Sequence, residues 1–125
     1  MRIILDSLPP KELRGNARLS TGFEQRWAVR RKAKDEFLGW LFVALQPYFL
    51  KPRVMLHKVV ADVVFVVPDK RHRDIENFIM AMKCIWDELV LMEYLEADDY
   101  EHFSYGKISF EVNKEEAPKT IIELR

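Results

Sequence analysis

The chain has 125 residues, 49% of them hydrophobic, which fits one domain over residues 1–125 with its own core. Its 20 basic and 20 acidic residues give a net charge of zero, which excludes a protein that binds nucleic acid through a large overall positive charge. One cysteine excludes an internal disulfide, and no run of about 18 apolar residues predicts a membrane helix. No secretory signal pattern opens the chain, so these features predict a cytoplasmic protein without a membrane partner.

Charge is unevenly distributed along the chain. Residues 1–34 hold nine basic and three acidic residues, a net charge of +6. Residues 84–125 hold four basic and eleven acidic residues, a net charge of −7. The basic part can bind phosphate if the acidic part faces elsewhere. The alternative is that the two parts attract each other, within one subunit or between two.

The first part of the chain predicts a strand, a loop and a long helix. Residues 2–6 form the strand and residues 7–22 the loop, which contains Pro9-Pro10, Gly15 and Gly22. Loops of this length in compact domains are usually functional or mobile. Thr21 is the predicted N-cap of a helix over residues 23–48, whose first half is strongly basic. Its recurring apolar residues are Phe23, Trp27, Phe37, Trp40, Leu41, Ala44, Leu45 and Tyr48.

The rest of the chain predicts more strands and a second helix. Residues 53–67 are β-branched and predict one or two strands, apolar on both faces as in a central strand covered by helices. Asp74 caps a helix over residues 75–93 with Phe78, Met82, Ile85 and Leu89 along one stripe. Strands follow over 103–112, where a glycine suggests a bulge, and over 119–124. This order predicts a small α+β domain: a mixed β-sheet with two main helices packed on it.

An acidic cluster inside a basic frame is the most informative feature of the sequence. It contains the run from Arg71 to Asn77, then Lys83 with Asp87, then the pair Asp98-Asp99. Carboxylates near arginines are what metal-dependent phosphodiester chemistry needs, because acids hold a hard cation and basic groups hold phosphate. A lone cysteine and three scattered histidines give no zinc pattern. The predicted metal is therefore Mg²⁺, with Mn²⁺ as an alternative.

These residues resemble the RusA-type Holliday junction resolvases of phage and prophage origin. The family pattern is a strand ending in Pro-Asp, a basic run, Asp-x-Asp-Asn, a helix with Lys and Asp four apart, and an Asp-Asp pair. Leu8-Pro9-Pro10, with Asn16 beyond it, is similar to the family's opening strand and loop. The resemblance covers most of the chain, and its specific part is residues 66–99. That part matches as Pro68-Asp69, Lys70 to Arg73, Asp74-Ile75-Glu76-Asn77, Lys83 with Asp87, and Asp98-Asp99.

The resemblance implies an Mg²⁺-dependent endonuclease that cuts four-way DNA junctions, and the near two-fold symmetry of such a junction favours a homodimer. It implies that Asp74, Glu76 and Asp99 are catalytic acids and metal ligands, and that Lys83 is the catalytic lysine. Two features depart from the family pattern. Glu76 stands where the family usually has Asp, and Lys83 lies three residues beyond the usual position, which Met80 occupies.

Each of these residues also has a structural interpretation. Asp74 is a good N-cap in its own right, and Lys83 with Asp87 is an ordinary i,i+4 pair. Basic residues on an exposed helix face, such as those over 26–34, often contact only water and bind no ligand. Tryptophans more often pack in a core or dimer than stack on bases; the chain has them at positions 27, 40 and 86. The main alternative function is a binding module of the same fold that holds branched DNA and cuts it weakly or not at all.

The predicted DNA contacts are basic residues of the first loop, the first helix and the segment before Asp74. Their charges would bind the phosphate backbone of a branched substrate. These residues are Lys11, Arg14, Arg18, Arg26, Arg30, Arg31, Lys70, Arg71 and Arg73.

Overall fold

A computed structural model describes the backbone of residues 1–14 and 23–125 and the side chains of residues 1–14 and 26–125. Arg18 and Thr21, a predicted DNA contact and a predicted N-cap, lie outside the described residues. One sheet contains four strands in the order β1-β4-β2-β3. Strand β4 is antiparallel to β1 and β2, whereas β2 and β3 are parallel. The strands are β1 (Arg2–Leu5), β2 (Val59–Val67), β3 (Phe103–Val112) and β4 (Lys119–Leu124).

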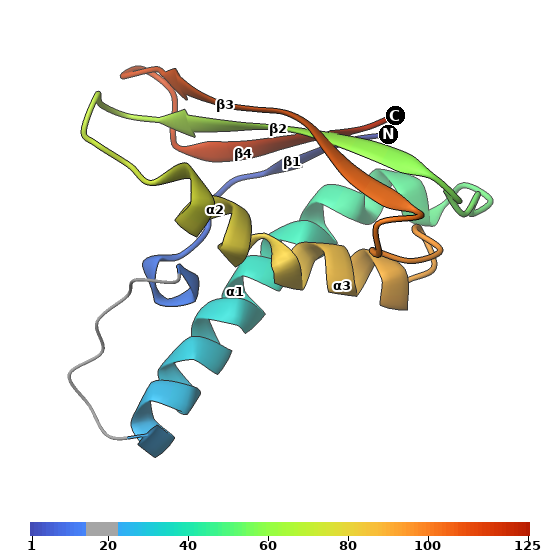
Figure 1. Cartoon of the computed structure of the whole chain (residues 1–125), viewed down its shortest axis with the longest axis horizontal. Helices are drawn as coiled ribbons and strands as arrows, with labels where there is room; N and C mark the ends of the chain where they lie inside the picture. Colours follow the sequence, from blue (N-terminus) through green and yellow to red (C-terminus); the bar gives the residue numbers. More distant parts are fainter. Residues whose placement is uncertain (15–22) are drawn as a thin grey trace.

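The described helices all lie on one side of this sheet (Figure 1). The architecture is therefore the mixed α+β sheet that the order of elements predicts. No helix in the described part of the chain is long and apolar enough to cross a membrane. The helices are the short 3₁₀ helix η1 (Lys11–Leu13), α1 (Phe23–Phe49), α2 (Ile75–Ala81) and α3 (Lys83–Leu91).

The core lies between the sheet and the helices. Alternate residues of β2 point into it, because side chains along a strand point to opposite faces in turn. Strand β2 is central, as its apolar sequence predicts, but helices cover only one of its faces. Val60, Asp62 and Val64 lie half-buried on the other face. The sheet therefore has one packed face and one face without helices.

Helix α1 buries only a narrow stripe of its surface. Ala33, Phe37, Leu41 and Leu45 form this stripe at a spacing of four residues. Every residue from 26 to 32 is exposed, and this end of the helix projects away from the sheet (Figure 1). Trp27 and Trp40 are 56% and 40% exposed, so neither is a core residue, in contrast to Trp86 at 2%.

The second helix is broken, which the sequence did not predict. It divides at Met82 into α2 and α3, because the Met82 N–H bonds the Ile79 carbonyl at 3.0 Å in a tighter turn. The predicted stripe is nevertheless buried: Phe78, Met82, Ile85 and Leu89 are at most 1% exposed. The single helix over residues 75–93 is thus corrected to two short ones that share one apolar face.

The two halves of this broken helix cover opposite ends of β2 and β3. Phe78 of α2 packs on Phe65 and Phe110, with ring centroids 5.0 and 5.1 Å away, near the carboxyl ends of these strands. Trp86 of α3 packs on Phe103 at 4.9 Å, at the amino end of β3. The start of α2 therefore lies near the carboxyl ends of the parallel strands.

Gly106 forms the bulge in β3 that its position predicts. The pairing with β2 shifts between Ala61 and Val63, so Asp62 faces both Gly106 and Lys107. The Asp62 carboxylate accepts the Lys107 N–H at 2.7 Å and the Arg125 Nε–H at 2.9 Å. These bonds, led by that from Arg125, lower the pKa of Asp62.

Candidate functional site

Asp74 and Glu76 begin α2 at the carboxyl end of β2. Asp74 is the N-cap, and its Oδ1 accepts the Glu76 N–H at 2.9 Å, so the predicted capping role is confirmed. Both side chains are exposed, and neither forms an ion pair with any described residue. The free N–H groups of a helix start favour negative charge there. Two carboxylates without a cation partner therefore stand at this end of the molecule.

The segment before Asp74 is held together by Arg73. Its guanidinium donates to the Asp69 carbonyl at 3.0 Å, the Arg71 carbonyl at 2.9 Å and the Asp69 Oδ1 at 2.9 Å. The Arg73 side chain is only 13% exposed, so it organises the loop rather than projecting from it. The N–H of Arg71 and the Arg73 side chain lower the pKa of Asp69. Lys70 and Arg71 are the exposed cations of this loop.

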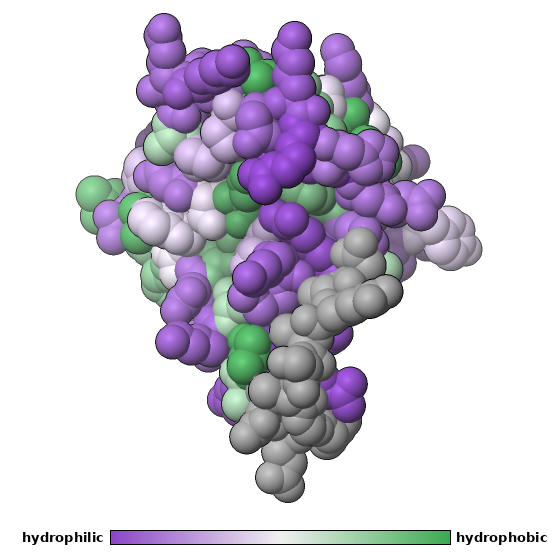
Figure 2. Space-filling view, turned by 90° about the vertical axis from the view of Figure 1, so that its left-hand side faces the viewer, coloured by the Kyte–Doolittle hydropathy of each residue, from purple (hydrophilic) through white to green (hydrophobic). Residues whose placement is uncertain are grey.

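A shallow pocket of about 290 Å³ lies between this loop and the ends of β2 and β3. Figure 2 looks on to this end of the molecule and shows hydrophilic side chains around small areas of hydrophobic surface. Such a rim of charge over an apolar floor can hold a phosphate-bearing ligand against the protein. The pocket is lined by Val67, Asp69, Lys70, Arg71, Arg73, Phe110 and Val112.

Asp99 does not lie with Asp74 and Glu76. Its carbonyl accepts the N–H of Phe103 at 2.8 Å, which places Asp99 at the amino end of β3. Because β3 is parallel to β2, this end lies beside Val59 and not beside Val67. Strands of this length span roughly 25–30 Å. No group of three potential metal ligands is assembled among the described residues.

The carboxylate of Asp99 has a local partner instead. Its Oδ1 lies 2.7 Å from Nδ1 of His102 and also accepts the N–H groups of Glu101 and His102. The contact with His102 lowers the pKa of Asp99 and raises that of His102. Sequence spacing alone gave no sign of this pairing.

Lys83 is held by two acids at the start of α3. Its Nζ bonds Asp87 Oδ1 at 2.8 Å, which confirms the predicted i,i+4 partner, and it also bonds Asp98. These bonds, first Asp87 and then Asp98, raise the pKa of Lys83. The ammonium group is therefore charged and ties the segment before β3 to α3. In the sequence Asp98 stands out only as a member of the Asp98-Asp99 pair.

The predicted DNA contacts among the described residues differ in how exposed they are. Arg14 is half-buried: its guanidinium lies 4.2 Å from the Phe78 ring centroid and donates to the Pro9 carbonyl, and burial lowers its pKa. Lys11 on η1 is exposed, as are Arg26, Arg30 and Arg31 on α1. The exposed cations therefore gather on the first half of α1, and Lys70 and Arg71 lie in the loop before α2.

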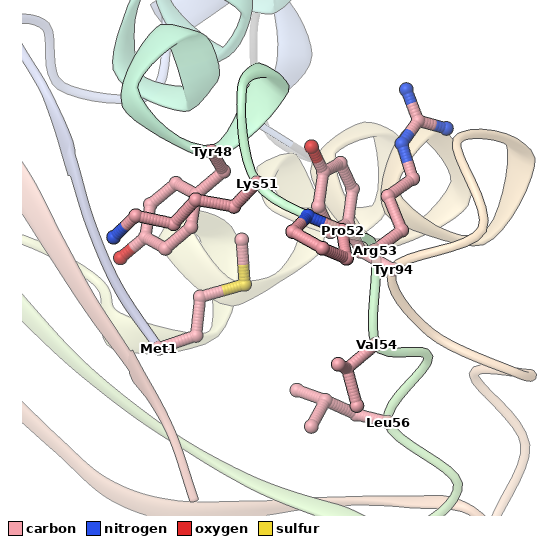
Figure 3. A pocket seen from close by; sticks show the side chains of 8 residues that line it. All are labelled: Met1, Tyr48, Lys51, Pro52, Arg53, Val54, Leu56 and Tyr94. Carbon is pink, nitrogen blue, oxygen red and sulfur yellow. The ribbon is translucent and has the colours of Figure 1, made fainter.

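A different pocket, of about 220 Å³, lies where α1 ends and the chain turns toward β2 (Figure 3). Its lining includes Met1, Pro52 and Leu56, and Arg53 lies over the ring of Tyr94 at 5.1 Å. The buried Tyr94 hydroxyl has no hydrogen-bond partner among the described residues. No carboxylate is found among the described residues that line this pocket.

No protein-family model matches the chain, and no curated protein matches it.

Proposed function

We propose that this protein is a metal-dependent endonuclease that acts on branched DNA, with four-way junctions as its preferred substrate. One observation carries the proposal: Asp74 and Glu76 are exposed carboxylates without cation partners among the described residues, a few residues from the exposed cations Lys70 and Arg71. Acids and cations in one short segment are what a phosphodiester needs, since one set binds the metal and the other binds phosphate. The resemblance to RusA-type resolvases rests on this same segment.

The residues at the start of α2 fit a magnesium ion. Mg²⁺ keeps several waters and is commonly bound by one or two carboxylates together with substrate phosphate. Asp74 and Glu76 supply two such carboxylates, and no arginine or lysine of the described structure neutralises them. When bound, Mg²⁺ or Mn²⁺ would supply the charge that activates a water and stabilises the leaving oxygen. Lys70 and Arg71 would bind the backbone phosphates next to the cut.

The proposed substrate also favours a homodimer. A four-way junction has near two-fold symmetry and needs two matched cuts, which two identical subunits provide. Two uncovered surfaces can supply the interface: the helix-free face of the sheet, with Ile4 42% exposed, and the outer side of α1, with Phe42 52% exposed. Light scattering of the parent, Ile4→Glu and Phe42→Glu tests the dimer and its interface. If the parent protein remains a monomer when junction DNA is added, the proposed homodimer is wrong.

A second candidate function is a module that binds branched DNA without cutting it efficiently. The separation of Asp99 from Asp74 favours it, because the third predicted ligand is missing from this subunit. Met80, at the position where the family has its lysine, is an exposed apolar side chain without charge. In this case the two carboxylates at the start of α2 would be remnants of a site.

One experiment separates the two functions. Labelled four-way junction, linear duplex and single strand are incubated with the protein in Mg²⁺, Mn²⁺ or EDTA. Junction cleavage in Mg²⁺ or Mn²⁺ that stops in EDTA supports the endonuclease. Junction-selective binding without cleavage in either metal supports the module. Equal binding of all three DNAs, with no cleavage, would contradict both.

A further inference from the structure

The first half of α1 carries cations that have no acidic partner among the described residues. Arg26, Arg30, Arg31, Lys32 and Lys34 form no ion pair and no side-chain hydrogen bond with the described residues. These five residues lie within nine positions, and each is exposed. Lysines and arginines that lie this close together repel one another unless an anion approaches them. This surface is therefore suited to a polyanion.

An exposed tryptophan lies within this basic surface. Trp27 is 56% exposed, and the guanidinium of Arg31 lies over its ring, 5.2 Å from the centroid. An exposed indole offers a flat apolar face on which a ligand can stack. Arg31 holds the ring against α1 and adds a positive charge beside it.

A pocket of about 400 Å³ opens beside this indole. Trp27, Arg30, Arg31 and Lys34 line it from one face of α1, because they recur at the spacing of a helical turn. Leu13 of η1 forms an apolar part of its wall. Its three cations outweigh Asp35, the only acid among the described residues that line it. Its size is in the range of sites that bind small molecules, roughly 300–1,000 Å³.

We propose that this pocket binds an unpaired nucleotide of the DNA strand, with the base stacked on Trp27 and phosphates held by Arg30, Arg31 and Lys34. Aromatic rings within a cationic groove are the common way to bind single strands, since every base has a face for stacking. Paired bases inside a duplex are already stacked on their neighbours. The pocket therefore selects branch points and single-stranded segments, where a base is free.

This inference rests on the proposed function, because it names the part of a branched substrate that α1 recognises. Its test is nevertheless independent of cleavage. Binding is measured in EDTA, so the outcome does not depend on Asp74, Glu76 or a metal ion. If the protein binds single strands through Trp27 but does not cut junctions, only the endonuclease proposal is wrong. If it cuts junctions but does not bind single strands through Trp27, only the pocket proposal is wrong.

The test measures the affinity of a fluorescein-labelled oligothymidine strand by anisotropy for Trp27→Ala, Trp27→Phe and Trp40→Ala. Stacking of one base is worth roughly fivefold to hundredfold in affinity. Trp27→Ala should weaken binding by at least fivefold, and Trp27→Phe should keep most of it. Trp40→Ala is the control, since Trp40 lies on the same helix, is 40% exposed and does not line the pocket. Circular dichroism shows that each variant is folded.

A second measurement reports contact with the indole directly. In a Trp40→Phe background, Trp27 is the one exposed tryptophan, since Trp86 is 2% exposed. Oligothymidine should quench its emission, whereas blunt duplex of equal length should not. Equal affinity of the parent and Trp27→Ala for the single strand would overturn the proposal. If free thymidine monophosphate quenches Trp27 emission at the same concentrations, the pocket does not recognise a nucleotide as part of a DNA strand.

Discussion

The carboxylate of Asp99 and the imidazole of His102 form a short contact, with Oδ1 2.7 Å from Nδ1. Asp99 lies at the amino end of β3, at the opposite end of the parallel strands from Asp74. The resemblance to RusA-type resolvases implies that Asp99 is a catalytic acid. The structure gives it a partner that is sensitive to pH near neutrality.

We predict that replacing Asp99 by Asn lowers the pKa of His102, because the Asp99 carboxylate is the main cause that raises it. The imidazole proton resonances of His102 in NMR spectra taken across the pH range measure this shift. Glu101→Gln should lower the pKa less, since Glu101 is a lesser cause of the same shift. An unchanged His102 pKa in Asp99→Asn would mean that the contact does not form in solution.

The same pair should make stability depend on pH. The raised pKa of His102 gives stability that is complete below about 6.5 and is lost as pH rises through the folded value. The lowered pKa of Asp99 gives stability that is complete above about 3.9 and is lost as pH falls through the folded value. The contribution is therefore complete between about pH 4 and 6.5 and declines on either side. Thermal unfolding of the parent and Asp99→Asn across this range should differ most inside this window.

A side chain at position 106 would collide with Asp62. An ideal Cβ on Gly106 would lie 2.0 Å from Asp62 Oδ1 and 2.8 Å from Val60 Cγ1. We predict that Gly106→Ala lowers the free energy of unfolding by about 1–3 kcal/mol, because Asp62 must give up its bonds to the bulge. Denaturant unfolding measures this loss.

The two positions should also be coupled. Removal of the Asp62 side chain makes room for the new methyl group, so Gly106→Ala should cost less in an Asp62→Ala background. If the losses in the free energy of unfolding of the two single variants simply add in the double variant, the Asp62 carboxylate is not what excludes a side chain at position 106.

A charge at position 80 should raise cleavage. Met80 is 57% exposed on α2, one turn beyond Glu76, so Met80→Lys adds an ammonium near the two carboxylates without burying it. We predict a faster cut of four-way junctions in Mg²⁺, measured under single-turnover conditions, because added positive charge stabilises the transition state. Lys83→Met is the comparison: Lys83 is already paired with Asp87 and Asp98. An unchanged cleavage rate in Met80→Lys would show that a charge at position 80 does not act on the site of cleavage.

The salt dependence of binding should report the basic surface of α1. Neutralising Arg30 and Arg31 together should lower the slope of log affinity against log salt by about 1–2, since each phosphate contact contributes roughly 0.7–0.9. Lys58→Gln and Lys107→Gln remove two exposed cations outside this surface and should leave the slope nearly unchanged. An equal loss of slope in both double variants would indicate a diffuse charge effect.

Much of the fold follows from local patterns in the sequence. The run of β-branched, apolar residues in β2 identifies a central strand, and Gly106 marks the bulge. The break at Met82 has no proline or glycine to announce it. The spacing of Trp27 and Trp40 fits a helix, but spacing cannot show how narrow the buried stripe of α1 is.

The candidate site was only partly predictable because strand direction is a property of the whole sheet. Asp74 as N-cap and Lys83 with Asp87 follow from spacing within one helix. The position of Asp99 depends on β3 being parallel to β2, which no local pattern encodes. The use of Arg73 inside its own loop likewise follows from tertiary contacts with Asp69.

The central claim is that the carboxylates at the start of α2 serve metal-dependent cleavage, and Asp74→Asn tests it most directly. Asn preserves the shape of the side chain and is also a good N-cap, so the fold should persist. Single-turnover cleavage of a four-way junction in Mg²⁺ should fall about a hundredfold to a thousandfold, while junction affinity in EDTA is retained or increased. Glu111→Gln, at an exposed acid of β3, should cut like the parent. Cleavage by Asp74→Asn at the parental rate would contradict the account.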